Sequence, residues 1–424
     1  MRRPKRLHRA ALAATAALVA LALAACTSVN AGAGIPQQQP GGLGTEVEKR
    51  LDSALTEAMT KAGASAGIAG VWAPWAGSWT AAPGTTALKG GTPVTTAMTF
   101  RAGQLTMPMS CTVLLSLVDD GKVKLDDPVT EWLPGLVGVT GVTLRELCQN
   151  TSGIGDYAGQ LRTQFLTNPT RSWPPLELAS DGIATARTGN PGEKYTPSQT
   201  NGILLGMALQ NATGTSWQQL YKERIFDRLG MDATVLPDAT VLTPPGPHPV
   251  GYAALPDATG KTVCEPMHDL TRLSPTVGWT SGGVVSTLDD LRTFSQALAS
   301  GSLVSERSAD AQAQGVPAGA SWQRYGLGMQ LLGPLRGASG AIPGYLSAMY
   351  TDPASGLTIV VALNNSTAGA GFAQALAERF ASIVSKVPAD TKGAKVVSAL
   401  PWSEQQAVDT MTKAAACPLP APKK

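Results

Sequence analysis

The chain has 424 residues, of which 43% are hydrophobic and 15% are charged. This balance is typical of a globular protein with a large core and excludes a disordered chain. The formal net charge is only +3 and is partly carried by the basic N-terminus, so the composition gives no electrostatic basis for binding nucleic acid.

The N-terminus is predicted to be an export signal. The basic stretch MRRPKRLHRA precedes the apolar run ALAATAALVALALAAC, which is too short for a transmembrane helix and ends in small residues. We therefore expect residues 1–25 to be a signal peptide.

The end of the run, Leu23-Ala24-Ala25-Cys26, resembles the lipobox of bacterial lipoproteins, in which cleavage leaves the cysteine as a lipid-bearing N-terminus. This resemblance implies a palmitate-bearing Cys26 that anchors the protein on the extracytoplasmic face of the cell membrane. An ordinary signal peptide with a chance cysteine is the alternative.

Composition divides the rest of the chain into three parts. Residues 26–44 are small, polar and rich in proline and glycine, which predicts a flexible tether. Residues 45–386 are predicted to form one domain. Residues 387–424 are predicted to form a C-terminal tail, with a short helix near residues 402–411 and a loose end.

The domain is predicted to combine helices with antiparallel strands. Apolar residues at helical spacing predict helices that begin at Thr45, that follow FRAG near residue 103, and that span residues 372–383. The stretches AGIAGVWAPWAGSWTAAPG and YLSAMYTDPASGLTIVVALNN each predict a hairpin of apolar strands. Three tryptophans of the first hairpin are expected to form an aromatic cluster that packs in the core, with a glycan-binding surface as the alternative: Trp72, Trp75 and Trp79.

The cysteines that remain if Cys26 is lipidated are even in number. Outside the cytoplasm such cysteines can form stable disulfides, and four of them allow three pairings. The alternative is that some are small buried thiols. Cys111 and Cys148 lie in predicted core helices, whereas Cys264 and Cys417 lie in looser segments. These locations do not decide among the three pairings.

Five stretches, in this order over residues 50–385, resemble the serine β-lactamase and penicillin-binding family, and its class C type most closely. They are FRAGQLTMPMSCTVLLSLVDDGKVKLDDPVTEWLP, VTLRELCQNTSGIGDY, PGEKYTPSQTNGILLGMALQNATG, GWTSGGVVSTLDDLRTFSQAL and GASGAIPGYLSAMYTDPASGLTIVVALNN. The resemblance implies an α+β, β-lactamase/transpeptidase-like fold, with an antiparallel sheet flanked by helices and an all-helical subdomain. It also implies descent from serine hydrolases such as β-lactamases, D-alanyl-D-alanine peptidases, D-aminopeptidases and esterases.

The nucleophile and the base that the resemblance implies are missing. The family places Ser-x-x-Lys at a helix N-terminus, where three-residue spacing puts the hydroxyl and the amine on one face. Counting back from Lys122 at the end of this helix puts Gln104 in the serine position and Met107 in the lysine position. A carboxamide is not a nucleophile, and a thioether cannot accept a proton at neutral pH.

The other two motifs of the family are substituted as well. Pro197 and Gln199 stand in the positions of the tyrosine and the asparagine of Tyr-x-Asn, and Tyr195 is a weak substitute for the tyrosine because it lies at a different depth. Ala338 stands in the position of the cation or imidazole of Lys/His-Thr-Gly, whereas Ser339 keeps the hydroxyl of the threonine.

The groups that remain predict a pocket that binds a ligand without converting it. The backbone N–H groups of Gln104 and Ala341 are expected to form an oxyanion-binding pair. We interpret the chain as a pseudoenzyme of the cell envelope that binds a cell-wall peptide, a glycan or a protein partner, with the membrane as its second partner. The predicted pocket residues are Gln104, Ser198, Ser339, Gly340 and Ala341.

Two other hypotheses remain. The first is an active serine hydrolase with a relocated nucleophile, although the histidines of the mature chain, His248 and His268, do not neighbour a candidate in the sequence. The second is a metal enzyme, which has few residues to build a site from, and no motif calls for another cofactor. The candidate nucleophiles are Ser110, Cys111, Ser198 and Ser339.

Overall fold

The computed structural model describes residues 34–257, 259–390 and 393–420. The predicted signal peptide, Cys26 and the first part of the predicted tether lie outside the described residues. Within these ranges, no helix is long and apolar enough to cross a membrane.

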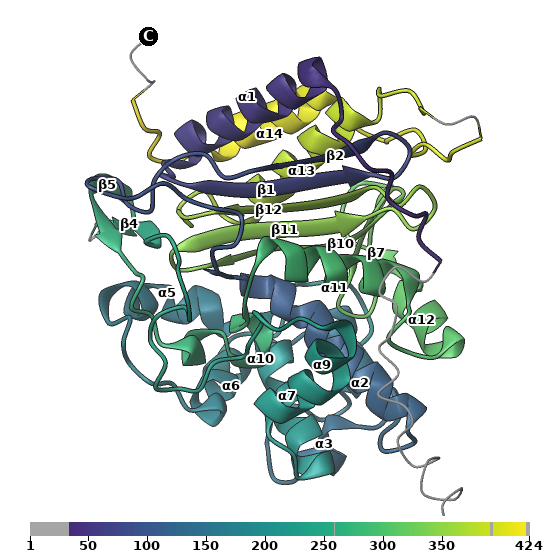
Figure 1. The fold of residues 1–424 in the computed structure, drawn as a ribbon. Coiled ribbons are helices and arrows are strands. Elements are labelled where there is room, and N and C mark those ends of the chain that lie inside the picture. Colours follow the sequence, from purple (N-terminus) through teal and green to yellow (C-terminus); the bar gives the residue numbers. More distant parts are fainter. Residues whose placement is uncertain (1–33, 258, 391–392, 421–424) are drawn as a thin grey trace, which may run out of the picture.

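An antiparallel sheet of eight strands forms the centre of the fold (Figure 1). Both predicted hairpins are confirmed, because the first two strands pair with each other and so do the last two. In spatial order the strands are β2 (Gly77–Ala81), β1 (Gly67–Ala73), β12 (Thr358–Leu363), β11 (Tyr345–Thr351), β10 (Leu335–Ile342), β9 (Gln330–Leu332), β8 (Gln323–Tyr325) and β7 (Val316–Pro317). Two small two-stranded sheets join β3 (Phe100–Arg101) to β6 (Val285–Ser286) and β4 (Tyr252–Pro256) to β5 (Thr262–Asp269).

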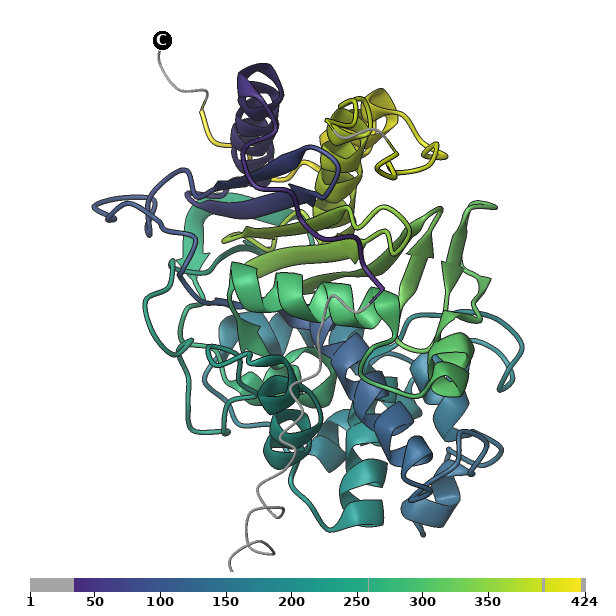
Figure 2. The ribbon, with the colours of Figure 1, turned by 45° about the vertical axis from the view of Figure 1, so that its right-hand side comes forward.

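Three helices cover one face of the sheet in both ribbon views (Figures 1 and 2). They are α1 (Thr45–Ala62), α13 (Ala370–Val384) and α14 (Glu404–Ala414). In α1 the apolar residues at helical spacing turn inward, and Leu51 and Leu55 are fully buried. The predicted helices at both ends of the domain are therefore confirmed.

The opposite face of the sheet carries α11 (Leu288–Ser300) and, beyond it, a helical subdomain (Figures 1 and 2). This arrangement confirms the predicted α+β fold with its all-helical part. The subdomain consists of η1 (Gly103–Leu105), α2 (Thr106–Asp119), α3 (Val129–Trp132), α4 (Leu144–Gln149), α5 (Tyr157–Thr167), α6 (Pro175–Ala184), α7 (Gln199–Thr213), α8 (Trp217–Tyr221), a π-helical turn (Lys222–Phe226), α9 (Asp227–Leu229), a 3₁₀ turn (Pro275–Val277) and α10 (Trp279–Gly282). The short helix α12 (Glu306–Ala313) lies outside it, near the β7 edge.

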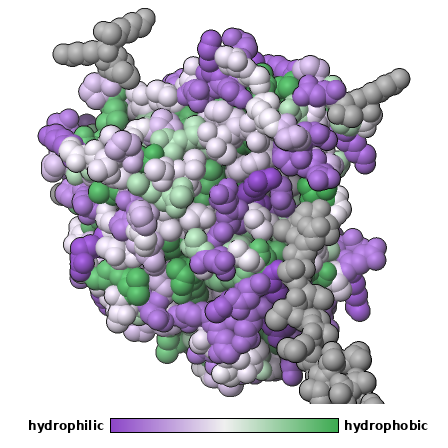
Figure 3. Space-filling model, viewed as in Figure 1, coloured by the Kyte–Doolittle hydropathy of each residue, from purple (hydrophilic) through white to green (hydrophobic). Residues whose placement is uncertain are grey.

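The three tryptophans of the first hairpin are core residues, but they do not form one cluster. Trp79 lies opposite Val71 in the register of β1 and β2. Because neighbouring side chains of a strand point to opposite faces, Trp72 points away from Trp79. Trp72 packs in the core between the sheet and the helical subdomain, whereas Trp75 and Trp79 pack under α1 and α13. On the surface shown in Figure 3, apolar residues are scattered among polar ones.

The segment before the domain is held against the sheet where it is described, which corrects the expectation of a flexible tether up to residue 44. The carbonyl of Gly41 accepts a hydrogen bond from the N–H of Ser78 at 2.9 Å. The side-chain amide of Gln38 donates to the carbonyl of Gly77 at 2.9 Å, and Leu43 is buried. Residues 38–43 therefore lie along the β2 edge of the sheet.

The C-terminal segment is also held in place between residues 402 and 417, which corrects the expectation of a loose end for this described part. The indole N–H of Trp402 donates to the carbonyl of Glu378 in α13 at 3.0 Å, and Met411 in α14 is fully buried. A disulfide joins Cys417 to Cys264 in β5. The tail thus completes the helical layer above the sheet.

Candidate functional site

A cavity of about 570 Å³ opens between the sheet and the helical subdomain. Strands β9 and β10 form its sheet wall, and η1, the start of α2, α5 and the segment before α7 form most of its helical wall. Apolar side chains such as Phe165, Leu166 and Ile342 line much of it, with polar groups interspersed. This combination is typical of small-molecule and peptide sites.

The cavity brings the three substituted motifs together, although they are far apart in the sequence. Gly340 lies directly behind the lining, and a Cβ atom at this position would come within 2.5 Å of the backbone nitrogen of Gln104. Only glycine lets β10 and η1 approach this closely. The sequence-predicted residues that line the cavity are Gln104, Met107, Pro197, Ser198, Gln199, Ala338, Ser339 and Ala341.

The Gln104 side chain is already hydrogen-bonded to one of the two backbone N–H groups predicted to bind an oxyanion. Its Oε1 atom accepts a hydrogen bond from the backbone N–H of Ala341. The expectation of an open pair of donors is therefore wrong for Ala341, because this N–H already has a partner. A carbonyl oxygen of the protein itself therefore lies where the resemblance predicts that a substrate oxygen would be held.

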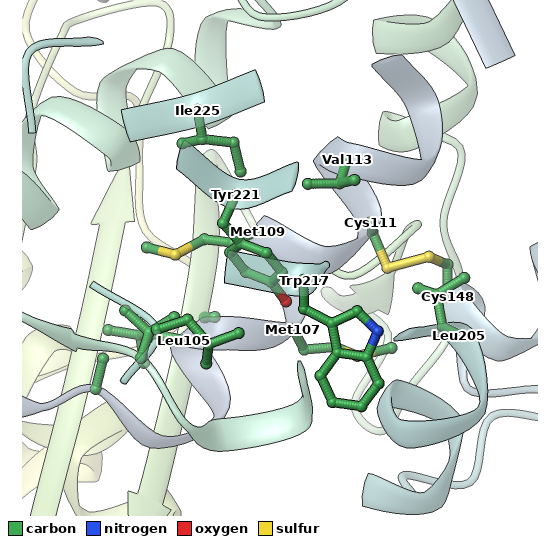
Figure 4. Packing of buried hydrophobic residues seen from close by; sticks show 14 of the residues in the cluster. Leu105, Met107, Met109, Cys111, Val113, Cys148, Leu205, Trp217, Tyr221 and Ile225 are labelled. Atoms are coloured by element: carbon green, nitrogen blue, oxygen red, sulfur yellow. A yellow bond between two sulfur atoms is a disulfide. The ribbon is translucent and has the colours of Figure 1, made fainter. Parts of the chain in front are cut away.

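Met107 has become a packing residue. It lies in the first turn of α2, its side chain is buried, and it belongs to the same apolar cluster as Trp217 (Figure 4). A Cβ atom at Gly202 of α7 would come within 3.2 Å of its sulfur, so the contact with α7 is close. The position where the family keeps its base is therefore filled by an apolar side chain.

A buried polar network fixes the segment that carries Pro197. The Oδ1 atom of Asn150 accepts hydrogen bonds from the Ser198 N–H at 3.2 Å and from the amide nitrogen of Asn201 at 2.8 Å. The Ser152 hydroxyl donates to the other end of Asn201 at 2.6 Å. Such networks stiffen a site when their members are satisfied. Sequence reasoning missed Asn150 as a lining residue, although the TSG turn starts immediately after it.

Tyr195 lines the cavity and stacks on Tyr325, with ring centroids 4.8 Å apart. Burial raises the pKa of Tyr195 to about 12, and it raises the pKa of Tyr325 further still. Both phenols are therefore protonated at neutral pH and can donate a hydrogen bond.

The candidate relocated nucleophiles are all engaged. Cys111 forms a disulfide with Cys148 (Figure 4). Ser110 is buried outside the cavity lining, where its hydroxyl contacts Tyr221 and the carbonyl of Thr280. Neither side chain can reach a substrate in the cavity.

The two candidate serines inside the cavity have no lysine or histidine beside them. The Ser198 hydroxyl donates to the carbonyl of Gly155 at 2.8 Å, and that of Ser339 donates to Oε1 of Gln330 at 3.4 Å. The residues that line the cavity include neither a lysine nor a histidine. Both His248 and His268 lie outside this lining.

Two charged residues line the cavity, and both belong to its helical wall. Asp156 caps α5, and its carboxylate accepts hydrogen bonds from the N–H groups of Gln199 at 2.9 Å and Ala158 at 3.3 Å. Burial raises the pKa of Asp156, while these hydrogen bonds oppose the rise. Arg162 lies further along α5 and is exposed. Sequence reasoning missed both, although Asp156 lies only three residues after Gly153 of the TSG turn.

The structure resolves the cysteine pairing that the sequence leaves open. The pairs are Cys111 with Cys148 and Cys264 with Cys417. Across the described part of the chain, no group of three or more histidine, cysteine, aspartate or glutamate side chains is placed to hold a metal ion.

Fold and site together define a protein built like a serine hydrolase of the penicillin-binding type. The sequence model of the Beta-lactamase family matches residues 51–382. The chain therefore belongs to this family, as its motifs predict.

Curated relatives match over part of their length. Penicillin-binding protein 4* of Bacillus subtilis is 29% identical over 34% of this chain and 31% of its own. The D-alanyl-D-alanine-carboxypeptidase/endopeptidase AmpH of Escherichia coli is 33% identical over 32% of this chain and 37% of its own. The matches thus span about a third of either relative.

Solved structures match over more of the chain. A D-stereospecific amidohydrolase from Streptomyces has a TM-score of 0.64 and 28% identity, covering 74% of this chain and 94% of its own. The D-amino acid amidase of Ochrobactrum anthropi SV3 has a TM-score of 0.66 over 87% of this chain and 98% of its own, at 22% identity, which supports the fold alone.

Proposed function

We propose that this protein is a catalytically inactive member of its family that binds a peptide in the cavity between the sheet and the helical subdomain. The observation that carries the proposal is the contact between the Gln104 side chain and the Ala341 N–H. It places a carboxamide where the family has its nucleophile, and the same carboxamide blocks a donor that would stabilise the transition state.

The losses at the other positions support the same function. Without Ser-x-x-Lys the site has no activated nucleophile, and Pro197 and Ala338 carry neither a proton donor nor a positive charge. A serine hydrolase without its catalytic side chains still accelerates the reaction by a factor of roughly 10³ to 10⁴ over the rate in water. Typical enzymes reach about 10⁶ and more, so binding is the stronger expectation.

The names of the similar proteins indicate which peptide to test first. AmpH is named for D-alanyl-D-alanine peptides, and the Streptomyces protein for D-stereospecific amide hydrolysis. A short peptide that contains D-alanine is therefore our first candidate ligand, and cell-wall peptides supply this chemistry. A glycan and an envelope protein are the other partners that the sequence predicts.

We expect no covalent adduct on the natural chain. The full-length protein in detergent would be incubated separately with a fluorescent penicillin and a fluorophosphonate, and its intact mass measured. The expected mass is unchanged, because the cavity holds no activated hydroxyl or thiol. A stoichiometric adduct on a folded protein, located by peptide mapping, would disprove catalytic inactivity and identify the nucleophile.

We also propose that a lipid on Cys26 holds the protein on the extracytoplasmic face of the membrane. The lipobox-like sequence supports this, and the two disulfides suit an oxidising compartment. Acyl chains contribute about 0.8 kcal/mol per buried CH₂, so several chains give firm anchoring.

In cells that are fed a clickable palmitate analogue, we expect the natural chain to be labelled and the variant Cys26→Ser to stay unlabelled. Equal labelling of both would refute lipidation at this residue.

A further inference from the structure

The orientation of the Gln104 carboxamide is fixed by its partner. A backbone N–H can only donate, so the Gln104 atom that accepts from Ala341 must be the oxygen. The NH₂ group therefore points away from β10. Among the described residues this nitrogen has no hydrogen-bond partner, and it is not among the buried polar atoms that lack one. Because Gln104 lines the cavity, its two N–H donors are open to a ligand there.

Gln330 in β9 repeats this arrangement on the sheet wall. Its Oε1 atom accepts hydrogen bonds from the hydroxyls of Tyr350 and Ser339. Both hydroxyls lie against the oxygen of the Gln330 carboxamide, so its NH₂ group points away from them. The Gln330 NH₂ group likewise has no partner in the described structure and is not buried. Gln330 also lines the cavity.

The sheet wall of the cavity is electrically neutral. Ala338 stands where the family has a cation or an imidazole. The charged residues that line the cavity lie on the other wall, with Asp156 at the N-cap of α5 and Arg162 within this helix. An ionised carboxylate brought to the sheet wall would lose water without gaining a positive partner, which is costly. An uncharged carbonyl oxygen needs only one or two N–H donors.

We propose that the Gln104 and Gln330 amides make this cavity selective for an uncharged carbonyl group, such as the amidated end of a short peptide, over a free carboxylate. The Ala341 N–H is taken up by the Gln104 oxygen, and the NH₂ group of the same carboxamide offers N–H donors to the cavity in its place. The proposal rests on the proposed function, because it assumes a peptide bound without turnover.

The test compares two probes that differ in one group. N-acetylated D-alanyl-D-alanine with a free carboxylate and the same dipeptide with a C-terminal primary amide would be titrated by calorimetry into the full-length protein in detergent. We expect the amide to bind roughly tenfold more tightly, the difference that one well-placed hydrogen bond or unpaired charge makes.

Three variants assign the effect to its residues. Gln330→Ala should weaken binding of the amide probe roughly tenfold, because it removes an N–H donor. Gln104→Glu should have the same effect, because its carboxylate can still accept from the Ala341 N–H but has no N–H group to donate. Ala338→Lys should return a positive charge to the sheet wall and reverse the preference toward the carboxylate. Gln405→Ala, an exposed glutamine in α14 far from the cavity lining, is the matched control and should bind both probes like the natural chain.

Each outcome decides the proposal. Tighter binding of the amide, loss in both glutamine variants and reversal in Ala338→Lys support it. Equal or tighter binding of the carboxylate to the natural chain overturns it, and so does binding of neither probe. If melting shows that Gln104→Glu is unfolded, Gln330→Ala and Ala338→Lys still decide. A covalent adduct in the mass experiment would instead overturn the proposed inactivity, so the two failures are distinguishable.

Discussion

The double variant Gln104→Ser/Met107→Lys is expected to be acylated by a fluorescent penicillin that leaves the natural chain unmodified. The two positions are three residues apart where η1 runs into α2, so the new hydroxyl and amine lie on one face of the chain. Met107 is buried, and burial lowers the pKa of a lysine, which favours its action as a base. Intact mass over several hours is the measurement.

Removing Gln104 also frees the Ala341 N–H, and one such donor is worth about 10² to 10³ in rate. The adduct should form slowly, because Pro197 and Ala338 still lack the groups that protonate the leaving group and hold a charged substrate. The matched control is Gln104→Ala/Met107→Lys, which has the base and the free donor but no hydroxyl. Labelling of this control, or none in the double variant when its melt is cooperative, would show that the serine position has been misplaced.

Removal of the Cys111–Cys148 disulfide by substitution of both cysteines with alanine is expected to lower the free energy of unfolding by about 4 kcal/mol. The bond closes a loop of 37 residues and links α2, which carries Met107, to α4, which leads into Asn150. Both cysteines are fully buried, so the alanines also leave a small cavity. Denaturant unfolding monitored by fluorescence and circular dichroism is the measurement.

The second disulfide is the control for this prediction. Loop length alone would make the Cys264–Cys417 bond, with 153 residues between its ends, worth about 5 kcal/mol. Because it fastens a segment close to the C-terminus, we expect its loss to release mainly that segment and to cost less global stability. A larger loss for Cys264→Ala/Cys417→Ala than for the first pair would contradict this reasoning.

Much of the fold could be predicted because local patterns are strong where the tertiary structure agrees with them. Leu51 and Leu55 follow helical spacing and are buried in α1, and the apolar runs on both sides of DPASG form β11 and β12. The tryptophans of the first hairpin show what local patterns do not predict. Their apolar character predicted burial, but only strand alternation and register decide that Trp72 and Trp79 lie on opposite faces of the sheet.

The ends of the domain show the same limit. Composition suggested a flexible segment up to residue 44 and a loose C-terminal end, because proline, glycine and small residues carry no periodic signal. Contacts with distant residues hold both: Gln38 reaches Gly77, and Cys417 is bonded to Cys264. Partners of this kind are set by the folded chain and leave no mark on local composition.

For the site, the sequence by itself determined which chemical groups are missing, since a serine, a lysine, a tyrosine and a cation cannot be supplied by Gln104, Met107, Pro197 and Ala338. Only the tertiary structure decided what replaces them. The contact of Gln104 with Ala341 joins residues 237 positions apart, and the carboxamide oxygen of Gln330 in β9 lies against Tyr350 in β11 and Ser339 in β10. Side-chain identity is local information, whereas the direction in which an amide presents its donors depends on partners that only folding brings within hydrogen-bond distance.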